Sequence, residues 1–143
     1  MHHITRMRTT VVTAAKRVGV YGGVIALLLM LCVAGSPEST FTVFGPQDFV
    51  RVAGKPATTT VSFPAPHPAL QYTLHIDNGG SQGTFVPVTS AVVSLNGVQI
   101  AGPSDFGQNV RVIDKPVMLA ATNTLTVELR SAPGSGFTLQ ITG

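Results

Sequence analysis

Two histidines are the first residues of this chain to consider for chemistry. His75 and Asp77 stand two positions apart in an alternating stretch, so in a strand their side chains would lie on the same face. A histidine and a carboxylate can both bind a metal ion, but two ligands are too few for a site. His67 lies among prolines at residues 64–68, where we expect a solvent-exposed loop residue. We therefore predict no metal site.

Other kinds of catalysis also lack the residues they need. A nucleophile requires a neighbouring base and an orienting group, and Ser135 lies in a Gly-Ser-Gly triplet without the spacing of a nucleophile elbow. The Asp-Phe-Gly triplet at 105–107 has the same residues as the metal-binding motif of protein kinases, but no other kinase motif accompanies it. Glycoside hydrolysis needs two carboxylates that flank a sugar, and no such pair stands out. The six acidic residues are Glu38, Asp48, Asp77, Asp105, Asp114 and Glu128. We expect no catalytic residue, no cofactor and no enzymatic activity.

The first 34 residues differ from the rest of the chain in charge and hydropathy. Their charged residues are all basic, and an apolar run follows at residues 18–34, which is the order found in a signal peptide. We predict a signal peptide at residues 1–34, cleaved after Ala34 or after Gly35, and a domain at residues 35–143. The basic and histidine residues of this leader are His2, His3, Arg6, Arg8, Lys16 and Arg17.

Two alternatives to cleavage stay open, and in both the membrane is a partner only through this segment. An uncleaved anchor would have to cross about 30 Å of hydrocarbon with 17 residues, three of them glycines. A lipid on Cys32 would fit the bacterial lipoprotein signal, but Leu31 stands where that signal has a small residue.

The remainder of the chain is neither basic nor able to form a disulfide. Residues 35–143 hold five basic and six acidic residues, a net charge of −1. We expect no nucleic-acid partner, because counterion release needs clustered cations. Cys32 is the only cysteine, so a domain that begins after it has no disulfide even in an oxidising compartment. Its stability has to come from packing.

Alternating hydropathy predicts strands throughout the domain. Residues 70–76 place Leu70, Tyr72, Leu74 and Ile76 on one face, and residues 123–130 and 137–141 alternate in the same way. One apolar and one polar face is typical of antiparallel sheets.

Turn residues separate these strands. Asn96-Gly97 lies between two apolar runs and predicts a two-residue hairpin. Residues 64–68 contain three prolines, so we interpret them as an extended crossover between sheets. Eight or nine short strands predict an all-β fold, a two-sheet antiparallel β-sandwich that is immunoglobulin-like or jelly-roll-like, preceded by an N-terminal signal or anchor helix.

One pattern occurs twice. Gly-Pro-x-Asp-Phe stands at residues 45–49 and again at 102–106, and each copy is followed by Val-Arg-Val and then by Lys-Pro. The plain explanation is that both halves of a sandwich use the same turn, then a strand with inward valines and an outward arginine, then a Lys-Pro edge. A duplicated surface motif is the alternative. We expect Phe49 and Phe106 to occupy similar environments.

Several of these motifs together resemble a known module. Residues 90–97, the Gly-Pro-Ser-Asp-Phe at 102–106, and residues 123–135 are similar to a β-sandwich module that recurs in large secreted and surface proteins of bacteria. The resemblance covers most of residues 43–143 and implies a fold and a compartment. Its motifs are turn and strand motifs, so it implies no site residues.

We therefore expect a non-enzymatic, secreted or periplasmic domain of the cell envelope with a structural or protein-interaction role. Its partner would be a protein or a cell-surface component, contacted along a strand edge that Lys55-Pro56 and Lys115-Pro116 would restrict. The alternative is a carbohydrate-binding module, but the chain has no tryptophan and Tyr72 lies on the apolar face. The oligomeric state stays open.

Overall fold

The structure is a computed structural model, and it describes residues 39–143. The predicted leader, residues 1–34 with Cys32, lies outside the described residues. Within residues 39–143, nine strands and one short 3₁₀ helix form the unit Thr40–Gly143, and no helix is long and apolar enough to span a bilayer. In chain order the elements are β1 (Thr42–Val50), β2 (Ala57–Pro64), β3 (Gln71–Asn78), β4 (Val86–Pro87), β5 (Ala91–Leu95), β6 (Val98–Ala101), η1 (Pro103–Asp105), β7 (Val112–Met118), β8 (Thr122–Leu129) and β9 (Ser135–Thr142).

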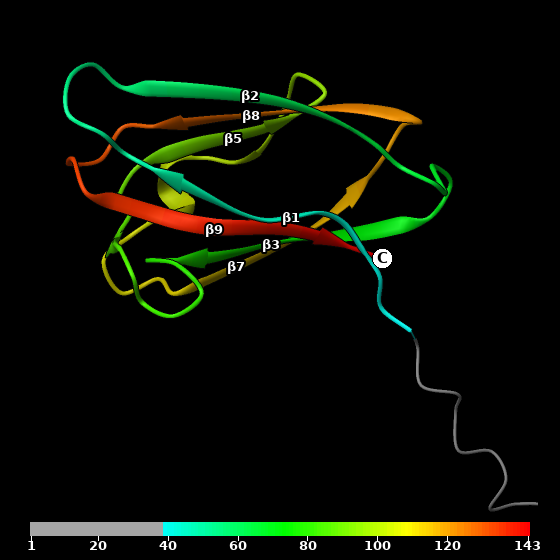
Figure 1. The fold of residues 1–143 in the computed structure, drawn as a ribbon, viewed down its shortest axis with the longest axis horizontal. Helices are drawn as coiled ribbons and strands as arrows, with labels where there is room; N and C mark the ends of the chain where they lie inside the picture. The colour runs from blue at the N-terminus through cyan, green and yellow to red at the C-terminus, as the bar shows by residue number, and fades with distance from the viewer. Residues whose placement is uncertain (1–38) are drawn as a thin grey trace, which may run out of the picture. The chain divides into compact units, whose positions relative to one another are not determined.

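The strands form two sheets that lie as layers, one above the other in Figure 1. The five-stranded sheet has the order β1-β9-β3-β7, with β4 paired to β9, and the four-stranded sheet has the order β2-β8-β5-β6. Neighbouring strands are antiparallel, except that β4 runs parallel to the start of β9. The prediction of an all-β sandwich of two antiparallel sheets is confirmed.

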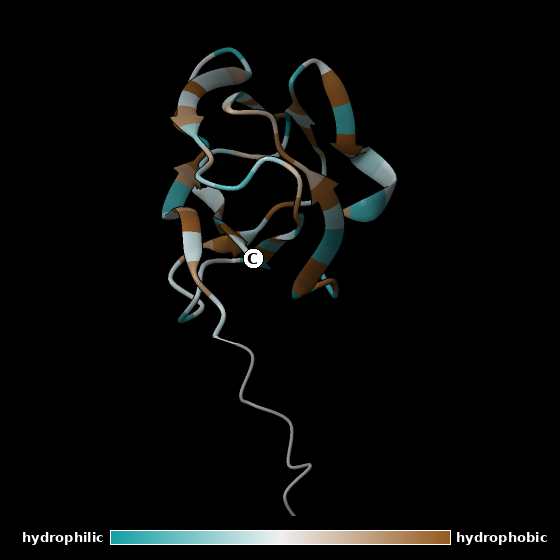
Figure 2. Ribbon diagram, turned by 90° about the vertical axis from the view of Figure 1, so that its right-hand side faces the viewer, coloured by the Kyte–Doolittle hydropathy of each residue, from teal (hydrophilic) through white to brown (hydrophobic). Residues whose placement is uncertain are grey.

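Two-residue alternation builds both layers. Figure 2 shows apolar and polar residues alternating along the strands. Tyr72, Leu74 and Ile76 of β3 are buried as predicted, whereas Leu70 is 48% exposed. Leu70 precedes the first residue of β3 and lies in the turn closed by its N–H donating to the carbonyl of His67. Because Leu70 lies outside the hydrogen-bonded strand, the two-residue alternation does not decide which way its side chain points.

The predicted connections of the four-stranded sheet are also confirmed. Asn96 and Gly97 join β5 to β6, and both have positive φ angles, 51° and 79°, as a type I′ turn requires. Residues 64–68 carry the chain from β2 in one sheet to β3 in the other. Pro64 is still paired with Thr122, as the last residue of β2.

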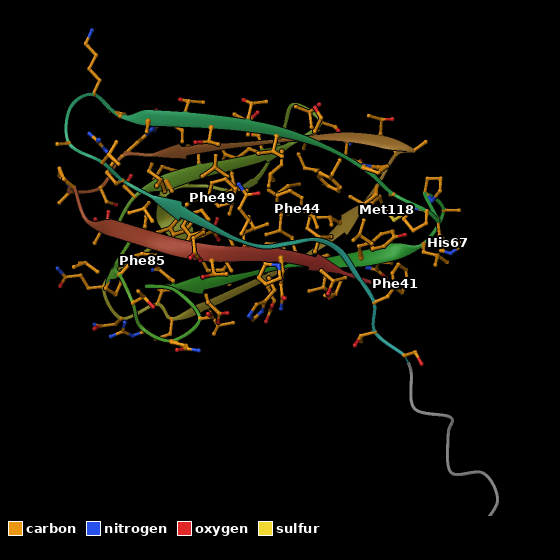
Figure 3. All side chains as sticks on the ribbon, in the orientation of Figure 1. Phe41, Phe44, Phe49, His67, Phe85 and Met118 are labelled. Atoms are coloured by element: carbon orange, nitrogen blue, oxygen red, sulfur yellow. The ribbon has the colours of Figure 1, made fainter. Side chains whose placement is uncertain are left out.

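Phenylalanine rings fill the space between the layers. Phe44 from β1 meets Phe63 from β2, with ring centroids 4.9 Å apart, and Figure 3 shows Phe44 and Phe49 between the sheets. The ring of Phe137 has two neighbours, Phe49 at 5.6 Å and Phe106 at 5.8 Å. Phe137 is fully buried, so it is a shared anchor for both copies of the repeated pattern.

Those two copies do not have the same structure. Residues 45–49 lie within β1, whose register with β9 shifts twice, whereas residues 102–106 contain η1. The prediction of one turn used twice is therefore wrong, and Asp48 is a strand residue rather than a turn residue. The expectation of similar surroundings is confirmed for the phenylalanines, because Phe49 and Phe106 are both buried against Phe137.

The prediction of inward valines and an outward arginine is wrong for the first copy, and in the second copy it holds for the exposed Arg111 but not for Val112. Arg51 is only 5% exposed, while Val50 and Val52 are 38% and 64% exposed. Because Phe49 points inward, alternation turns Val50 outward, and β1 ends before Arg51. The guanidinium of Arg51 folds back and donates to the carbonyls of Val52 and Gly54. In the second copy, Val112 is 51% exposed, since Ile113 and Val117 are the buried residues of β7.

Candidate functional site

A polar cluster on the outer face of the five-stranded sheet contains His75, Asp77 and Asp114. Strand β3 places His75 and Asp77 on this face, as predicted, and the pairing of β3 with β7 sets Asp114 opposite His75. The Nδ1 atom of His75 lies 2.6 Å from Asp114 Oδ1, and Nε2 lies 3.2 Å from Asp77 Oδ1. We call these three residues the histidine cluster.

The surroundings of His75 favour its charged form. Partial burial lowers the pKa of His75, but the hydrogen bond to Asp114 and the charge of Asp77 outweigh that effect and raise its pKa above the ordinary 6.5. Each ring nitrogen faces a carboxylate, and only the imidazolium can donate from both. The cluster is therefore an ion-pair arrangement that ties β3 to the edge strand β7.

The same geometry limits what the cluster can do chemically. Both nitrogens of His75 are directed at carboxylates, and in the described part of the chain no serine or threonine hydroxyl is hydrogen-bonded to the ring, as a nucleophile–base pair would be. Among residues 39–143, no group of three or more potential ligands has a metal-binding arrangement. The third polar residue that meets His75 and Asp77 is a second acid, Asp114.

A second polar row continues beside the cluster. Thr138 of β9 is paired with both Asp77 and Asp48, and its hydroxyl donates to Asp48 Oδ1 at 2.5 Å. The N–H of Ser81 donates to the same hydroxyl at 3.2 Å. The loop before β4 thus folds over this end of the sheet, which explains why Thr138 is buried although it lies on the outer face.

The remaining residues that the sequence suggested lie apart from the cluster. His67 is exposed in the crossover, as predicted, with its ring 6.1 Å from that of Phe41, and Figure 3 places both at the end opposite Phe85. Asp105 forms an ion pair with Lys115, 2.8 Å from Oδ1 to Nζ. Sequence reasoning missed the part played by Asp114, because its place opposite His75 depends on which strand pairs with β3.

Aromatic residues offer little surface for stacking on a sugar. Tyr72 is 1% exposed, and its hydroxyl donates to the carbonyl of His67. Phe41 is half-buried against Tyr72, with the two rings 6.0 Å apart at 83°. Phe85 lies over Gly136, where a Cβ would come within 3.0 Å of its ring. The exposed parts of these rings do not form one flat face.

The sheet edges are a second candidate for function, and three of the four are protected. Strand β1 contains Pro46 and two register shifts, and the exposed Asp48. Strand β7 carries the Asp114-Lys115-Pro116 sequence. Strand β6 has four residues and a register shift against β5. Charges, prolines and irregular pairing are the means by which edges avoid pairing with other chains.

Strand β2 lacks these features. Its eight residues pair with β8 in one unbroken register, from Ala57 opposite Leu129 to Pro64 opposite Thr122. It contains no charged residue, and its proline is the last residue. In Figure 1, β2 runs along the rim of the upper layer, and within residues 39–143 no strand pairs with its outer side. Lys55 and Pro56 lie just before this strand rather than in it.

Comparisons of the chain with protein-family models, with curated proteins and with solved structures found no match. The assignment of a role therefore depends on the two candidates described above, the histidine cluster and the edge of β2.

Proposed function

We propose that this chain is an exported, non-enzymatic β-sandwich domain that binds another protein by adding a strand to the edge of β2. The observation that carries this proposal is the contrast among the four edges, since β2 alone is long, regular and uncharged. An unprotected edge of this kind is a template for strand addition, in which backbone hydrogen bonds provide the affinity.

The backbone of β2 supports this mode of binding. The N–H of Ala65 donates to the carbonyl of Ala121 at 3.0 Å, and in an antiparallel ladder alternate residues bond to the same neighbour. The odd-numbered residues of β2 therefore bond to β8. The N–H and C=O groups of Thr58, Thr60 and Ser62 point to the free edge, where a partner strand can pair with them.

The side chains beside this edge also suit a protein partner. Thr58, Thr60 and Ser62 are exposed, and the hydroxyl of Thr60 lies 3.3 Å from that of Thr126 on β8. The β-branched residues among them favour an extended strand, so the edge is already in the conformation that a partner needs. Little ordering entropy remains to oppose association.

Site-specific photo-crosslinking in the producing cells tests this proposal. A photoreactive residue in place of Thr58 or Ser62 should cross-link to another protein chain, because both positions lie at the edge. The same residue in place of Thr126, one strand inward, is the matched control and should give several-fold less product. Equal yields from the edge and from Thr126, or no product above background from either edge position, would overturn strand addition at β2.

Export is tested separately by mass spectrometry of the chain recovered from outside the cytoplasm. We expect it to begin at Gly35 or Ser36, as cleavage of the leader requires. A chain that begins at Met1 would contradict cleavage, and a lipid mass on Cys32 would replace it with the lipoprotein alternative.

A further inference from the structure

The edge of β2 is bounded by two prolines placed symmetrically about its centre. Pro56 precedes Thr60 by four residues and Pro64 follows it by four. Both prolines have even numbers, like the residues whose backbone groups point to the free edge, and neither proline has an N–H. The outward donors of this edge are therefore those of Thr58, Thr60 and Ser62, a set that is symmetric about Thr60.

We propose that the partner of this edge is a second copy of the same chain, paired antiparallel with Thr60 opposite Thr60 on a twofold axis. This inference rests on the proposed function of β2 and names the occupant of its edge. A twofold dimer uses the same surface on both copies, so that surface must be self-complementary. The arrangement of donors and prolines in β2 meets this condition.

The register follows from matching the backbone groups. With Thr60 opposite Thr60, Thr58 faces Ser62 of the other copy and Pro56 faces Pro64. Each N–H and each C=O of the three donor residues then has a partner. A shift by two residues in either direction keeps the number of backbone hydrogen bonds but sets Ser62 or Thr58 against a proline, so a carbonyl of the three donor residues then faces a ring that has no N–H.

The side chains agree with this register. The pairs on the outer face are Thr with Thr and Thr with Ser, and such cross-strand pairs are favourable. On the inner face, Thr59 lies opposite Val61 of the other copy, which covers an exposed and a half-buried side chain. β2 contains no charged residue, so the pairing of two copies of this strand brings no like charges of β2 together.

Disulfide trapping tests both the partner and the register. The full chain carrying Cys32→Ser has no other thiol, so a single engineered cysteine reports its own neighbours. Thr60→Cys should form a covalent dimer on mild oxidation, because opposite Cα atoms in a hydrogen-bonded pair lie about 5.5 Å apart, within disulfide range. Thr58→Cys alone should not, since its copies would be about 13 Å apart along the strands. A mixture of Thr58→Cys and Ser62→Cys should form the mixed dimer.

Thr126→Cys controls for random collision, because it lies on the same face one strand inward, where its side chain is half-buried. Circular dichroism and thermal unfolding of each variant show that it is folded. The proposal is supported if Thr60→Cys gives several-fold more covalent dimer than Thr126→Cys and the mixture of Thr58→Cys and Ser62→Cys gives the mixed dimer. Equal trapping at positions 60 and 126, or trapping by Thr58→Cys alone, overturns it.

This result is separable from the fate of the proposed function. If trapping fails while photo-crosslinks from Thr58 or Ser62 lead to a different protein, strand addition at β2 stands and the second copy is excluded. If trapping and photo-crosslinking both fail, strand addition is excluded as well.

Discussion

Residues 45–49 and 102–106 share four of their five residues, Gly-Pro-x-Asp-Phe, yet they have different backbones and different neighbours. The first copy continues β1, and its aspartate accepts a hydrogen bond from Thr138 on the adjacent strand. The second copy forms η1, where Asp105 accepts from the N–H of Gly102 and from Lys115. The phenylalanines alone keep the same role, since both pack against Phe137.

The comparison teaches that burial constrains this pattern more than local backbone preference does. The position of each phenylalanine is held by a large transfer free energy, whereas the Gly-Pro-x-Asp stretch is part of strand β1 in one copy and includes the 3₁₀ helix η1 in the other. The neighbouring strand therefore decides between the two, and each position of the pattern can be tested against its counterpart.

The largest effect is expected at the shared anchor. Phe137→Ala should destabilise the fold by about 3–5 kcal/mol, because it empties a fully buried site. Phe49→Ala and Phe106→Ala should each cost about 3 kcal/mol or more, and each should be non-additive with Phe137→Ala, since the rings are in contact. Denaturant unfolding measures all of these. A cost below about 1 kcal/mol for one phenylalanine alone would show that the two are not equivalent.

The first position of the pattern should show the sharpest difference. Gly45 has a φ of +75°, and a Cβ there would lie 2.3 Å from the carbonyl oxygen of Leu139, so Gly45→Ala should cost at least about 2 kcal/mol. Gly102 has a φ of −118°, and its Cβ would meet only the side chain of Gln99, which can move. Gly102→Ala should cost less than about 1 kcal/mol. Equal losses of thermal stability in the two variants would contradict this comparison.

The aspartates should differ in how acid affects them. Lys115, together with the Gly102 N–H, holds the pKa of Asp105 below its ordinary value of 3.8. The resulting stabilisation is complete above that value and is lost as the pH falls through the folded-state pKa. Asp105→Asn should therefore cost up to about 1 kcal/mol at neutral pH, and this cost should shrink on acidification.

Asp48→Asn is the matched control for that measurement, because the described residues form no ion pair with Asp48 and an amide oxygen can still accept from Thr138. Unfolding of both variants across the acidic range gives the comparison. A cost of Asp105→Asn that does not change with pH would exclude the ion pair as its cause.

The smallest effect is expected at Asp114, the residue before the Lys-Pro of the second copy. Its counterpart in the first copy is Gly54, which has no side chain to form an ion pair. Because the pKa of His75 is raised above 6.5, its pairing stabilises the fold fully below about that pH and ceases to do so as the pH rises through the folded-state pKa. Asp114→Asn should cost less than about 1 kcal/mol, and only on the acidic side.

An NMR titration of His75 checks this directly, since its pKa should fall in Asp114→Asn. Asp77→Asn should lower it as well, by removing the second carboxylate. An unchanged titration midpoint in both variants would mean that neither carboxylate stabilises the imidazolium.

Much of this architecture could be predicted from the amino-acid sequence alone. Alternation identified the buried residues of β3, β8 and β9, and Asn96-Gly97 identified a hairpin, because both signals depend on residues that are close in sequence. His75 and Asp77 were placed on one face for the same reason. Leu70 and Val52 were misplaced because they lie outside the strands, where the alternation stops, and Val50 was misplaced because the alternation from the buried Phe49 turns it outward.

The faces of the regular strands β3, β8 and β9 and the apolar composition of the core thus follow from the sequence, since side-chain direction within a strand depends only on the two-residue repeat. Tertiary structure alone decided that Asp114 meets His75, that Phe49 and Phe106 share one ring, and that β2 lies at an edge. Each of these depends on which strands pair, and pairing joins residues that are far apart along the chain. Local sequence patterns do not show which strands pair.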